Sequence, residues 1–282
     1  MAHFFTAFLA LLSFSALAVP LERAKITELV NDVRIIERST RATRRAQVTE
    51  EFRSPDVMRT GANSRAEMIS PDQTVVRVGS NTLFSFEPDS REIELQKGSI
   101  LFHSPSGRGG GTIRTSAASA AVLGTTLIVS ATSTGAMKVM LLEGRGKVTV
   151  PGRKSVVLSA GQLALVLPGG RLSPVVDFQL SRQVADAKLV RGFRHPLQSG
   201  PRVAEAVQRQ ERRIGDGKLG PRDPSRPPPR KGGTSNPPPK PPPPPPPTPA
   251  PGGVRPDVAI QAQKADDKRK PPPPPPPPKQ KR

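Results

Sequence analysis

The sequence predicts a mostly β protein: one multi-stranded domain of the sandwich or roll type, then one or two short helices and a disordered tail. Between residues 24 and 170, short apolar runs are separated by Gly, Pro, Asn, Asp and Ser. In Arg91 to Gln96, Ile93 and Leu95 alternate with glutamates, the period of a half-buried strand. From Pro221 on, the chain holds 26 of its 36 prolines and too few apolar residues for a core. Strands this short and this regularly spaced favour an all-β domain over an α/β one.

The first 18 residues have the pattern of a signal peptide. Phe4 to Ala18 carry no charge and end in Ala16-Leu17-Ala18, the small-x-small pattern that signal peptidase accepts, which predicts cleavage after Ala18. The run has about 15 residues, fewer than the roughly 20 that span a bilayer. Because Met1-Ala2-His3 contains no Lys or Arg, an uncleaved anchor or a buried N-terminal element remains an alternative. The expected location is the periplasm, the cell envelope or the medium.

Further strands are predicted along the domain, separated by turn signals such as Glu143-Gly144 and Ala160-Gly161. The predicted strands after Gln96 are Ile100 to Phe102, Thr112 to Thr115, Thr126 to Ser130, Lys138 to Leu142, Lys147 to Val150, Ser155 to Leu158 and Gln162 to Leu167. A turn is predicted at Lys97-Gly98. The opening segment is ambiguous, because its apolar residues from Ile26 to Ile36 also fit an amphipathic helix.

A series of short motifs resembles the FecR-domain family. Thr60-Gly61 is followed by Ser64, Arg65, Ala66 and Glu67, as in the first signature of such domains. Six further matches come in the expected order: Val78 to Thr82, Leu95 to Gly98, Ile113 to Thr115, Gly124-Thr125, Leu142 to Gly144 with Val148 after it, and Ala160 to Gln162. Each match is weak alone, but the series over about 145 residues is specific.

The resemblance implies a β-rich domain at residues 24–170 and favours strands over a helix for Lys25 to Ile36. Classical members sit in the inner membrane, carry an N-terminal anti-sigma segment and relay a periplasmic signal. This chain has a signal-peptide pattern in that place, so we expect an exported, non-enzymatic binding or scaffold protein. A periplasmic signalling partner of a membrane sensor or an anti-sigma pathway is the alternative.

We interpret the motif residues as structural. Glycine reaches positive φ and allows close chain approach without steric cost, and this reasoning applies to Gly61, Gly98, Gly124, Gly144 and Gly161. Thr60, Ser64, Arg65, Ala66 and Thr125 belong to the same signatures. The sequence separation of Glu67 and Glu143 gives no ground for pairing them as acid and base, and both are expected to be solvated or salt-bridged.

No catalytic, cofactor or metal motif is present in the sequence. There are no cysteines, and His3, His103 and His195 are isolated from one another. No serine lies in a Gly-x-Ser-x-Gly or Ser-x-x-Lys context. We therefore expect no enzyme activity and no cofactor.

Helical propensity appears only after Pro174. Ser181 to Val190 and Arg202 to Arg213 are predicted as helices, and Gly215-Asp216-Gly217 as a stop signal. Residues 171–216 are thus predicted as a helical extension of the β domain.

The basic residues suggest contact with anions. Of the net charge of +20, residues 201–282 carry +11. Within the folded part, Arg38, Arg41, Arg44 and Arg45 form a cluster; on a helix the first three would share a face and could meet phosphate or carboxylate groups, although a solvated loop explains them as well. Specific nucleic-acid binding is not expected, because there is no Tyr or Trp for base stacking; it becomes the alternative if the chain is not exported.

Residues 217–282 are predicted as a basic, proline-rich tail. Runs such as Pro241 to Pro247 and Pro271 to Pro278 favour polyproline II rods, and the whole stretch from Pro221 to Arg282 would reach up to about 190 Å if fully extended. Three roles remain open: a cationic spacer that contacts an anionic wall or membrane surface, a ligand for a groove that binds polyproline, and an inert tail. The expected partners are an unknown protein or an anionic envelope polymer.

Overall fold

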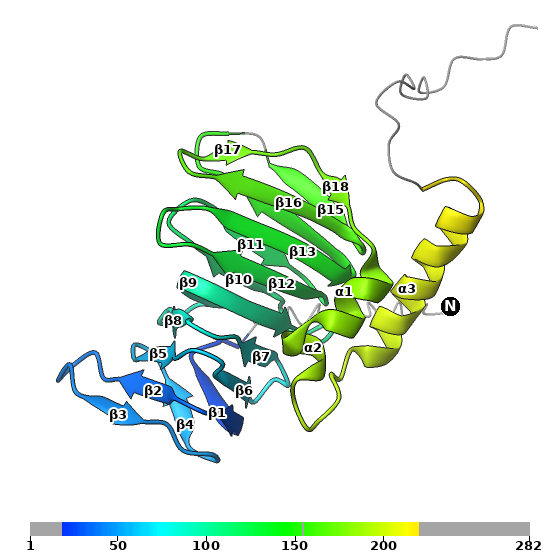
Figure 1. Cartoon of the computed structure of the whole chain (residues 1–282). Coiled ribbons are helices and arrows are strands. Elements are labelled where there is room, and N and C mark those ends of the chain that lie inside the picture. Colours follow the sequence, from blue (N-terminus) through cyan, green and yellow to red (C-terminus); the bar gives the residue numbers. More distant parts are fainter. Residues whose placement is uncertain (1–18, 154, 220–282) are drawn as a thin grey trace, which may run out of the picture. The chain divides into compact units, whose positions relative to one another are not determined.

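The computed structural model describes residues 19–153 and 155–219, in which eighteen strands form two stacked layers and three helices follow (Figure 1). The predictions for the signal peptide with Ala18 and for most of the tail lie outside the described residues. The mostly β fold is confirmed, and Lys25 to Ile36 forms strands rather than a helix.

The first layer runs in the order β4, β1, β6, β7, β9, β12, β13 and β16, with β17 and β18 both pairing to β16. Its strands are β1 (Arg23–Val30), β4 (Glu51–Arg53), β6 (Arg65–Ile69), β7 (Val75–Val78), β9 (Glu92–His103), β12 (Thr126–Ala131), β13 (Met137–Glu143), β16 (Gln162–Leu167), β17 (Arg171–Leu172) and β18 (Val176–Asp177). The last two strands lie in the segment that the sequence predicts as helical.

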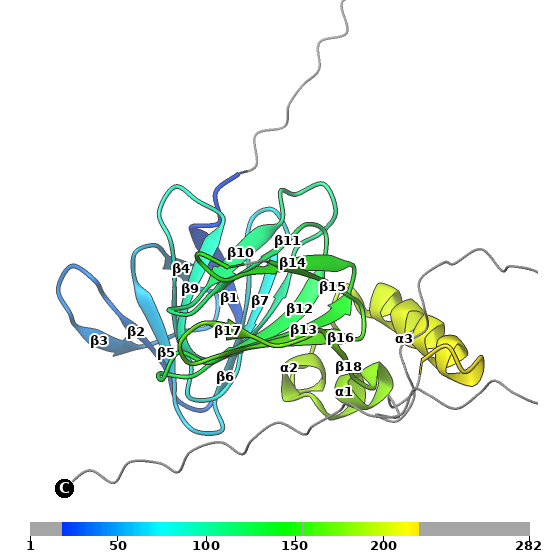
Figure 2. The ribbon, with the colours of Figure 1, turned by 90° about the horizontal axis from the view of Figure 1, so that it is seen from above.

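The second layer runs in the order β3, β2, β5, β8, β9, β10, β11, β14 and β15. Its other strands are β2 (Val33–Ile36), β3 (Thr43–Arg45), β5 (Val57–Thr60), β8 (Leu83–Phe86), β10 (Gly111–Arg114), β11 (Ser119–Val122), β14 (Arg145–Thr149) and β15 (Val156–Ser159). All pairs are antiparallel except β9 with β10. The hairpin of β2 and β3 projects from the body of the domain (Figures 1 and 2).

Strand β9 belongs to both layers. Its first half pairs with β8 and its second half with β7 and β12, and Gly98 lies at the crossing with φ of +96°. The predicted turn at Lys97-Gly98 is therefore wrong: the chain bends there without reversing. A bend in one long strand joins the two layers covalently.

The main core lies between the layers. Alternate residues of each strand point inward, as in β13, where Met137, Val139 and Leu141 are buried in it. The ring centroid of Phe52 of β4 lies 5.5 Å from that of Phe84 and 5.3 Å from that of Phe86, both of β8, and this packing ties the layers together.

Three helices cover part of the outer face of the first layer (Figures 1 and 2). They are α1 (Leu180–Asp186), α2 (Lys188–Arg191) and α3 (Gly200–Gly215). Helix α3 buries Val203, Ala206 and Gln210, spaced along one side of the helix. The Gln210 side chain accepts a hydrogen bond from the Leu180 amide at 2.8 Å and donates one to the Phe178 carbonyl at 2.7 Å. It thereby provides a partner for a backbone N–H at the start of α1, which has none within the helix. We call residues 178–215 the cover.

Candidate functional site

The outer face of the first layer carries a regular pattern of side chains beneath the cover. Strand register places Glu67, Arg77, Leu101, Ile128 and Met140 in one line across β6, β7, β9, β12 and β13. A second line contains Ile69, Val75, His103, Thr126 and Glu143. The first line is polar at the β6 end and apolar at the β13 end. The second line is apolar at the β6 end and polar at the β13 end. The face therefore has an apolar centre between two groups of polar side chains, which we call the first and the second anchor because both bind the cover.

The apolar part binds the helices of the cover. Leu101, Ile128, Met140 and Leu142 form a buried cluster with residues of the cover, namely Leu180, Leu189, Leu197, Val203 and Ala206. Because these strands are buried on both faces, their sequences read as nearly continuous apolar runs rather than as an alternation.

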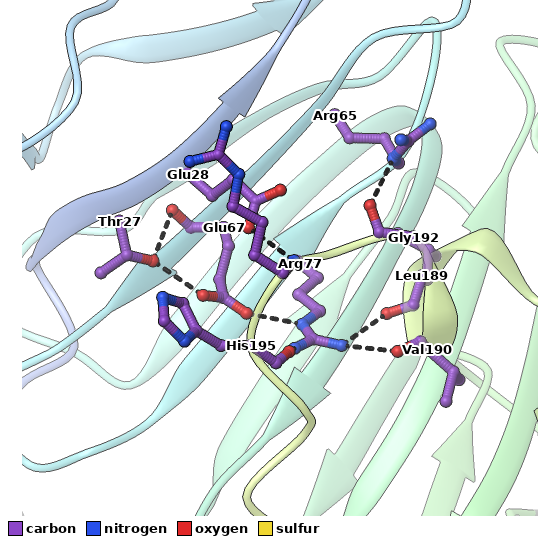
Figure 3. A network of polar contacts seen from close by, with 10 residues as sticks. Thr27, Glu28, Arg65, Glu67, Arg77, Leu189, Val190, Gly192 and His195 are labelled. Atoms are coloured by element: carbon purple, nitrogen blue, oxygen red, sulfur yellow. Dashed lines mark hydrogen bonds and ion pairs between the residues drawn. The ribbon is translucent and has the colours of Figure 1, made fainter.

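Arg77 is the first polar anchor (Figure 3). Its Nε donates to Oε2 of Glu67 at 2.7 Å, and both side chains are almost completely buried. Its Nη atoms donate to the carbonyls of Leu189 at 3.2 Å, Val190 at 2.9 Å and His195 at 2.7 Å. One guanidinium thus binds three carbonyls between the end of α2 and the loop before α3.

Neighbouring contacts complete this anchor. The Arg77 guanidinium lies 4.6 Å from the ring centroid of Phe193, and the Thr27 hydroxyl donates to Oε1 of Glu67 at 2.9 Å. Arg65 donates to the Gly192 carbonyl at 3.2 Å, and Glu28 accepts the Arg194 amide at 2.9 Å. A buried charge pair requires such saturation, because each ion loses its water on burial.

The second anchor joins His103, Thr126 and Glu143 to the beginning of α3. The Thr126 hydroxyl lies 2.8 Å from Oε1 of Glu143, 2.8 Å from the Ser199 hydroxyl and 3.0 Å from Nδ1 of His103. When Thr126 donates its one proton to Glu143, its lone pairs can accept from Ser199 and His103. Arg202 of α3 lies 3.5 Å from Oε1 of Glu143.

Burial changes the acid–base behaviour of this second anchor. Desolvation, and to a smaller extent the charge of Arg202, lowers the pKa of His103 to about 4. A hydrogen bond with the Thr125 backbone raises this pKa but does not offset the lowering. Desolvation also raises the pKa of Glu143, although the hydrogen bond from Thr126 and the charges of Arg202 and Arg209 act to lower it. His103 is therefore neutral near pH 7.

Two hollows lie beside the anchors. One, of about 350 Å³, lies between Ile69 and Val75 of the sheet and Pro196 and Leu197 of the cover, next to Arg77. The other, of about 400 Å³, is a cleft in the cover itself, lined by Val184, Val190, Arg191, Phe193, Arg194, Pro196, Leu197, Gly200, Val203 and Ala204. Its lining is apolar except for two arginines, so it fits an apolar side chain that has a negative charge beside it.

Most motif residues stabilise the conformation of the backbone, either through hydrogen bonds with backbone groups or through the φ angles of their glycines. The Thr60 hydroxyl donates to the Gly79 carbonyl at 2.6 Å and accepts the Thr82 amide at 2.9 Å. Ser64 accepts the Asp32 amide at 3.0 Å, and the Gly61 amide donates to the Asp32 carbonyl. Ala66 is buried in the main core. Thr125 donates to the Arg145 carbonyl at 3.0 Å, and Gly98, Gly124, Gly144 and Gly161 all have positive φ.

Arg65 and Glu143 of the motifs also contact the cover directly, and Glu67 is linked to it through Arg77. Arg65 and Glu67 point outward from β6 into the first anchor, and Glu143 belongs to the second. Both glutamates are salt-bridged, Glu67 to Arg77 and Glu143 to Arg202.

The structure separates the four clustered arginines, which lie on the β2–β3 hairpin rather than on a helix. Arg44 is paired with Glu37 at 3.3 Å and Glu50 at 2.9 Å. The Arg38 amide binds Asp56, and Arg41 lies in the turn with φ of +60°. Arg45 points to the face opposite to that of Arg44, because they are neighbours on a strand. The four residues do not form one binding face.

Sequence reasoning missed Arg77, Thr126 and Ser199. Arg77 had a detectable signal, because a lone charge in the strand Val75–Val78 is costly unless it is paired. Ser199 is 73 residues from Thr126, and nothing in the local sequence indicates their contact. In the described part of the chain, no three His, Cys, Asp or Glu side chains are placed to hold a metal ion. Likewise, none of the helices described has the length and apolarity to cross a membrane.

Comparisons with known proteins show a family similarity for part of the domain. Residues 56–147 match the model of the family described as FecR protein. The comparison with curated proteins found no match. Two crystal structures of a candidate anti-sigma factor from Parabacteroides distasonis ATCC 8503 are similar, each with 22% identity and a TM-score of 0.41, and they cover 46% and 48% of this chain. The matches span 63% and 64% of those chains, just under two thirds of their length.

Proposed function

Because the chain carries a FecR domain at residues 56–147, we propose that it is a signalling protein of the cell envelope that acts by binding another protein. The family match is the observation that carries this proposal. Classical members of this family relay periplasmic signals, and the sequence pattern of residues 1–18 supports export. The partner is a component of a membrane sensor or an anti-sigma pathway.

The environment of the buried polar groups supports binding rather than catalysis. Every nitrogen of the Arg77 guanidinium donates to a protein acceptor, and Thr126 and Ser199 are buried under the cover. Reactive groups need access to a substrate, whereas these groups hold the cover in place. The central residues of both anchors, Glu67 with Arg77 and Thr126 with its neighbours His103 and Glu143, lie within the residues of the family match, and their partners on the cover lie beyond it.

The partner is proposed to bind the cleft in the cover. Val184, Val190 and Phe193 supply half-buried apolar surface to its lining, and the exposed Arg191 and Arg194 supply positive charge. The matching segment has an apolar side chain next to a carboxylate, since arginine pairs well with carboxylates. The tail of the same chain is positively charged overall and does not match this description, so the proposed partner is another protein.

Transcript levels in native cells test the proposal. Deletion of the gene should change a defined set of transcripts, and the wild-type gene should restore them. The double variant Arg191→Glu/Arg194→Glu should fail to restore them. Arg212→Glu/Arg213→Glu is the matched control, because it makes the same charge change on the exposed end of α3. Both variants are first checked by circular dichroism for an unchanged fold.

The outcomes separate the possible roles. Unchanged transcripts after deletion would contradict signalling and favour the scaffold role that the sequence also predicts. Full rescue by Arg191→Glu/Arg194→Glu would keep signalling but exclude the cleft. Location is tested by fractionation and intact mass: a chain starting at Val19 outside the cytoplasm supports export, and an uncut chain in the cytoplasm contradicts it.

A further inference from the structure

Three arginines of the second layer lie directly beside one another. In the register of β3, β2 and β5, Arg45 is opposite Arg34, and Arg34 is opposite Arg59. The line continues through Leu83 of β8 to Lys97 of β9. We call Arg34, Arg45 and Arg59 the arginine row.

The arginine row faces solvent. Directly opposite residues of a β-sheet point to the same side, and their sequence neighbours point to the other side. The neighbours Val33, Ile35 and Met58 are buried in the main core. All three arginines, and Lys97 as well, are exposed.

Fold stability does not explain this arrangement. Like charges directly opposite each other on neighbouring strands are destabilising. Arg34 is paired with Asp32 at 2.9 Å, but Arg45, Arg59 and Lys97 have no ion pair among the residues that the structure describes. Some other exposed arginines are compensated, such as Arg44 by Glu37 and Glu50. The row holds positive charge in excess of what its surroundings neutralise.

The spacing and the surroundings define the ligand. Neighbouring strands lie about 4.8 Å apart, so the row spans roughly 10 Å, and about 19 Å with Lys97. Guanidinium groups bind phosphate and carboxylate oxygens in pairs. The large apolar side chains that the described structure exposes, such as Val48 and Leu123, are not in this line, and Leu83 is half-buried. A protein interface normally needs such an apolar anchor, and an array of charges without one suits a linear polyanion.

We propose that the arginine row binds a linear polyanion with repeated phosphate groups. This site is separate from the cleft in the cover and does not depend on the signalling role. It also differs from the predicted cluster, since only Arg45 belongs to both sets. Phosphate groups along the polymer replace the missing carboxylates and relieve the repulsion between the arginines.

Thermal unfolding of the full chain tests the site with tripolyphosphate as the probe. Ligands that bind only the folded state raise the unfolding midpoint. The row variant is Arg34→Gln/Arg45→Gln/Arg59→Gln. The control variant, Arg23→Gln/Arg53→Gln/Arg182→Gln, removes three exposed arginines that have carboxylate partners. Both variants keep the basic tail and have the same net charge, so their difference reports the row alone.

We expect tripolyphosphate to raise the midpoint of the wild type and the control variant by about 3 °C or more, and that of the row variant by much less. Orthophosphate at the same phosphorus concentration should have a smaller effect on the wild type, because it cannot bridge the arginines. Without any anion, the row variant should unfold no earlier than the wild type, because a repulsion is removed. Equal shifts in the row and control variants, or equal effects of the two phosphates, would overturn the proposal.

Discussion

Arg77 acts as a connector because its five donors are shared between one carboxylate and three carbonyls of the cover. Removing one member of a buried ion pair leaves the other charge buried without its partner. We therefore expect Arg77→Met or Glu67→Met to lower the free energy of unfolding by about 3 to 5 kcal/mol. Urea unfolding at pH 7 measures each change.

The double variant distinguishes the charge pair from simple packing. Arg77→Met/Glu67→Met leaves no unpaired charge, so its loss should be clearly smaller than the sum of the two single losses. Additive losses would show that the two side chains contribute independently. Exposed pairs such as Arg182 with Asp186 provide the contrast, with an expected coupling below about 1 kcal/mol.

His103 predicts how stability depends on pH. Its pKa is about 4 in the folded chain and near 6.5 when unfolded, so the unfolded chain binds a proton first as the pH falls. Stability is thus lost between about pH 6.5 and pH 4. The raised pKa of Glu143 acts in the opposite direction, because the folded chain then takes up its proton earlier.

Comparison with His103→Gln isolates the histidine. Between pH 7 and pH 4.5 the wild type should lose about 2 kcal/mol more of its unfolding free energy than this variant. His195→Gln removes an exposed imidazole and should follow the wild type. The idea fails if the wild type and His103→Gln lose the same amount.

The residues of the two anchors illustrate what the sequence could predict. Glu67 and Glu143 were expected to be solvated or salt-bridged, and both are salt-bridged. Their partners could not be named, because Arg77 reaches carbonyls 112 to 118 residues away. Such contacts depend on how the cover folds back over the sheet, which no local pattern encodes.

At the scale of single elements, the two halves of β9 depend on Gly98. A Cβ atom there would lie 2.4 Å from the Thr82 Cα atom, and φ is +96°. Gly98→Ala should therefore lower the free energy of unfolding by more than about 2 kcal/mol. Gly107→Ala is the control: its φ is also positive, at +78°, but no atom lies within 4 Å of the added Cβ. It should cost about 1 kcal/mol, and equal costs would contradict a steric role for Gly98.

Helices and strands were predicted correctly where the local sequence pattern determines the structure. Predictions failed where contacts with distant parts of the chain determine it. The alternation at Arg91 to Gln96 predicted a strand that is present in β9, and the two predicted helical stretches are present as α1 with α2 and as α3. Lys97-Gly98 reads as a turn, because glycine marks turns and bulges alike. The period of the apolar residues in Lys25 to Ile36 did not separate helix from strand, whereas the family resemblance did.

At the scale of the whole molecule, the described chain contains two apolar clusters that share one sheet. The main core lies between the layers, and the smaller one lies between the first layer and the cover. The smaller cluster buries few residues, and two polar anchors supplement it. A region with few apolar contacts opens at a lower free energy than the core does. We infer that the cover detaches before the sandwich unfolds.

Native-state hydrogen exchange can test this order with two matched substitutions. Val203 of α3 belongs only to the smaller cluster and Val139 of β13 only to the main core, and both are almost fully buried. Val203→Ala should speed exchange both in residues 180–215 and in the strands, because the cover is open in the partly opened state and in the globally unfolded state. Val139→Ala should speed exchange in β9, β12 and β13, because it lowers the free energy of global unfolding by about 2 kcal/mol, and should leave exchange in residues 180–215 nearly unchanged. If Val139→Ala speeds exchange in the helices as much as in the strands, cover and sandwich open as one cooperative unit, and the cover is not a separable element.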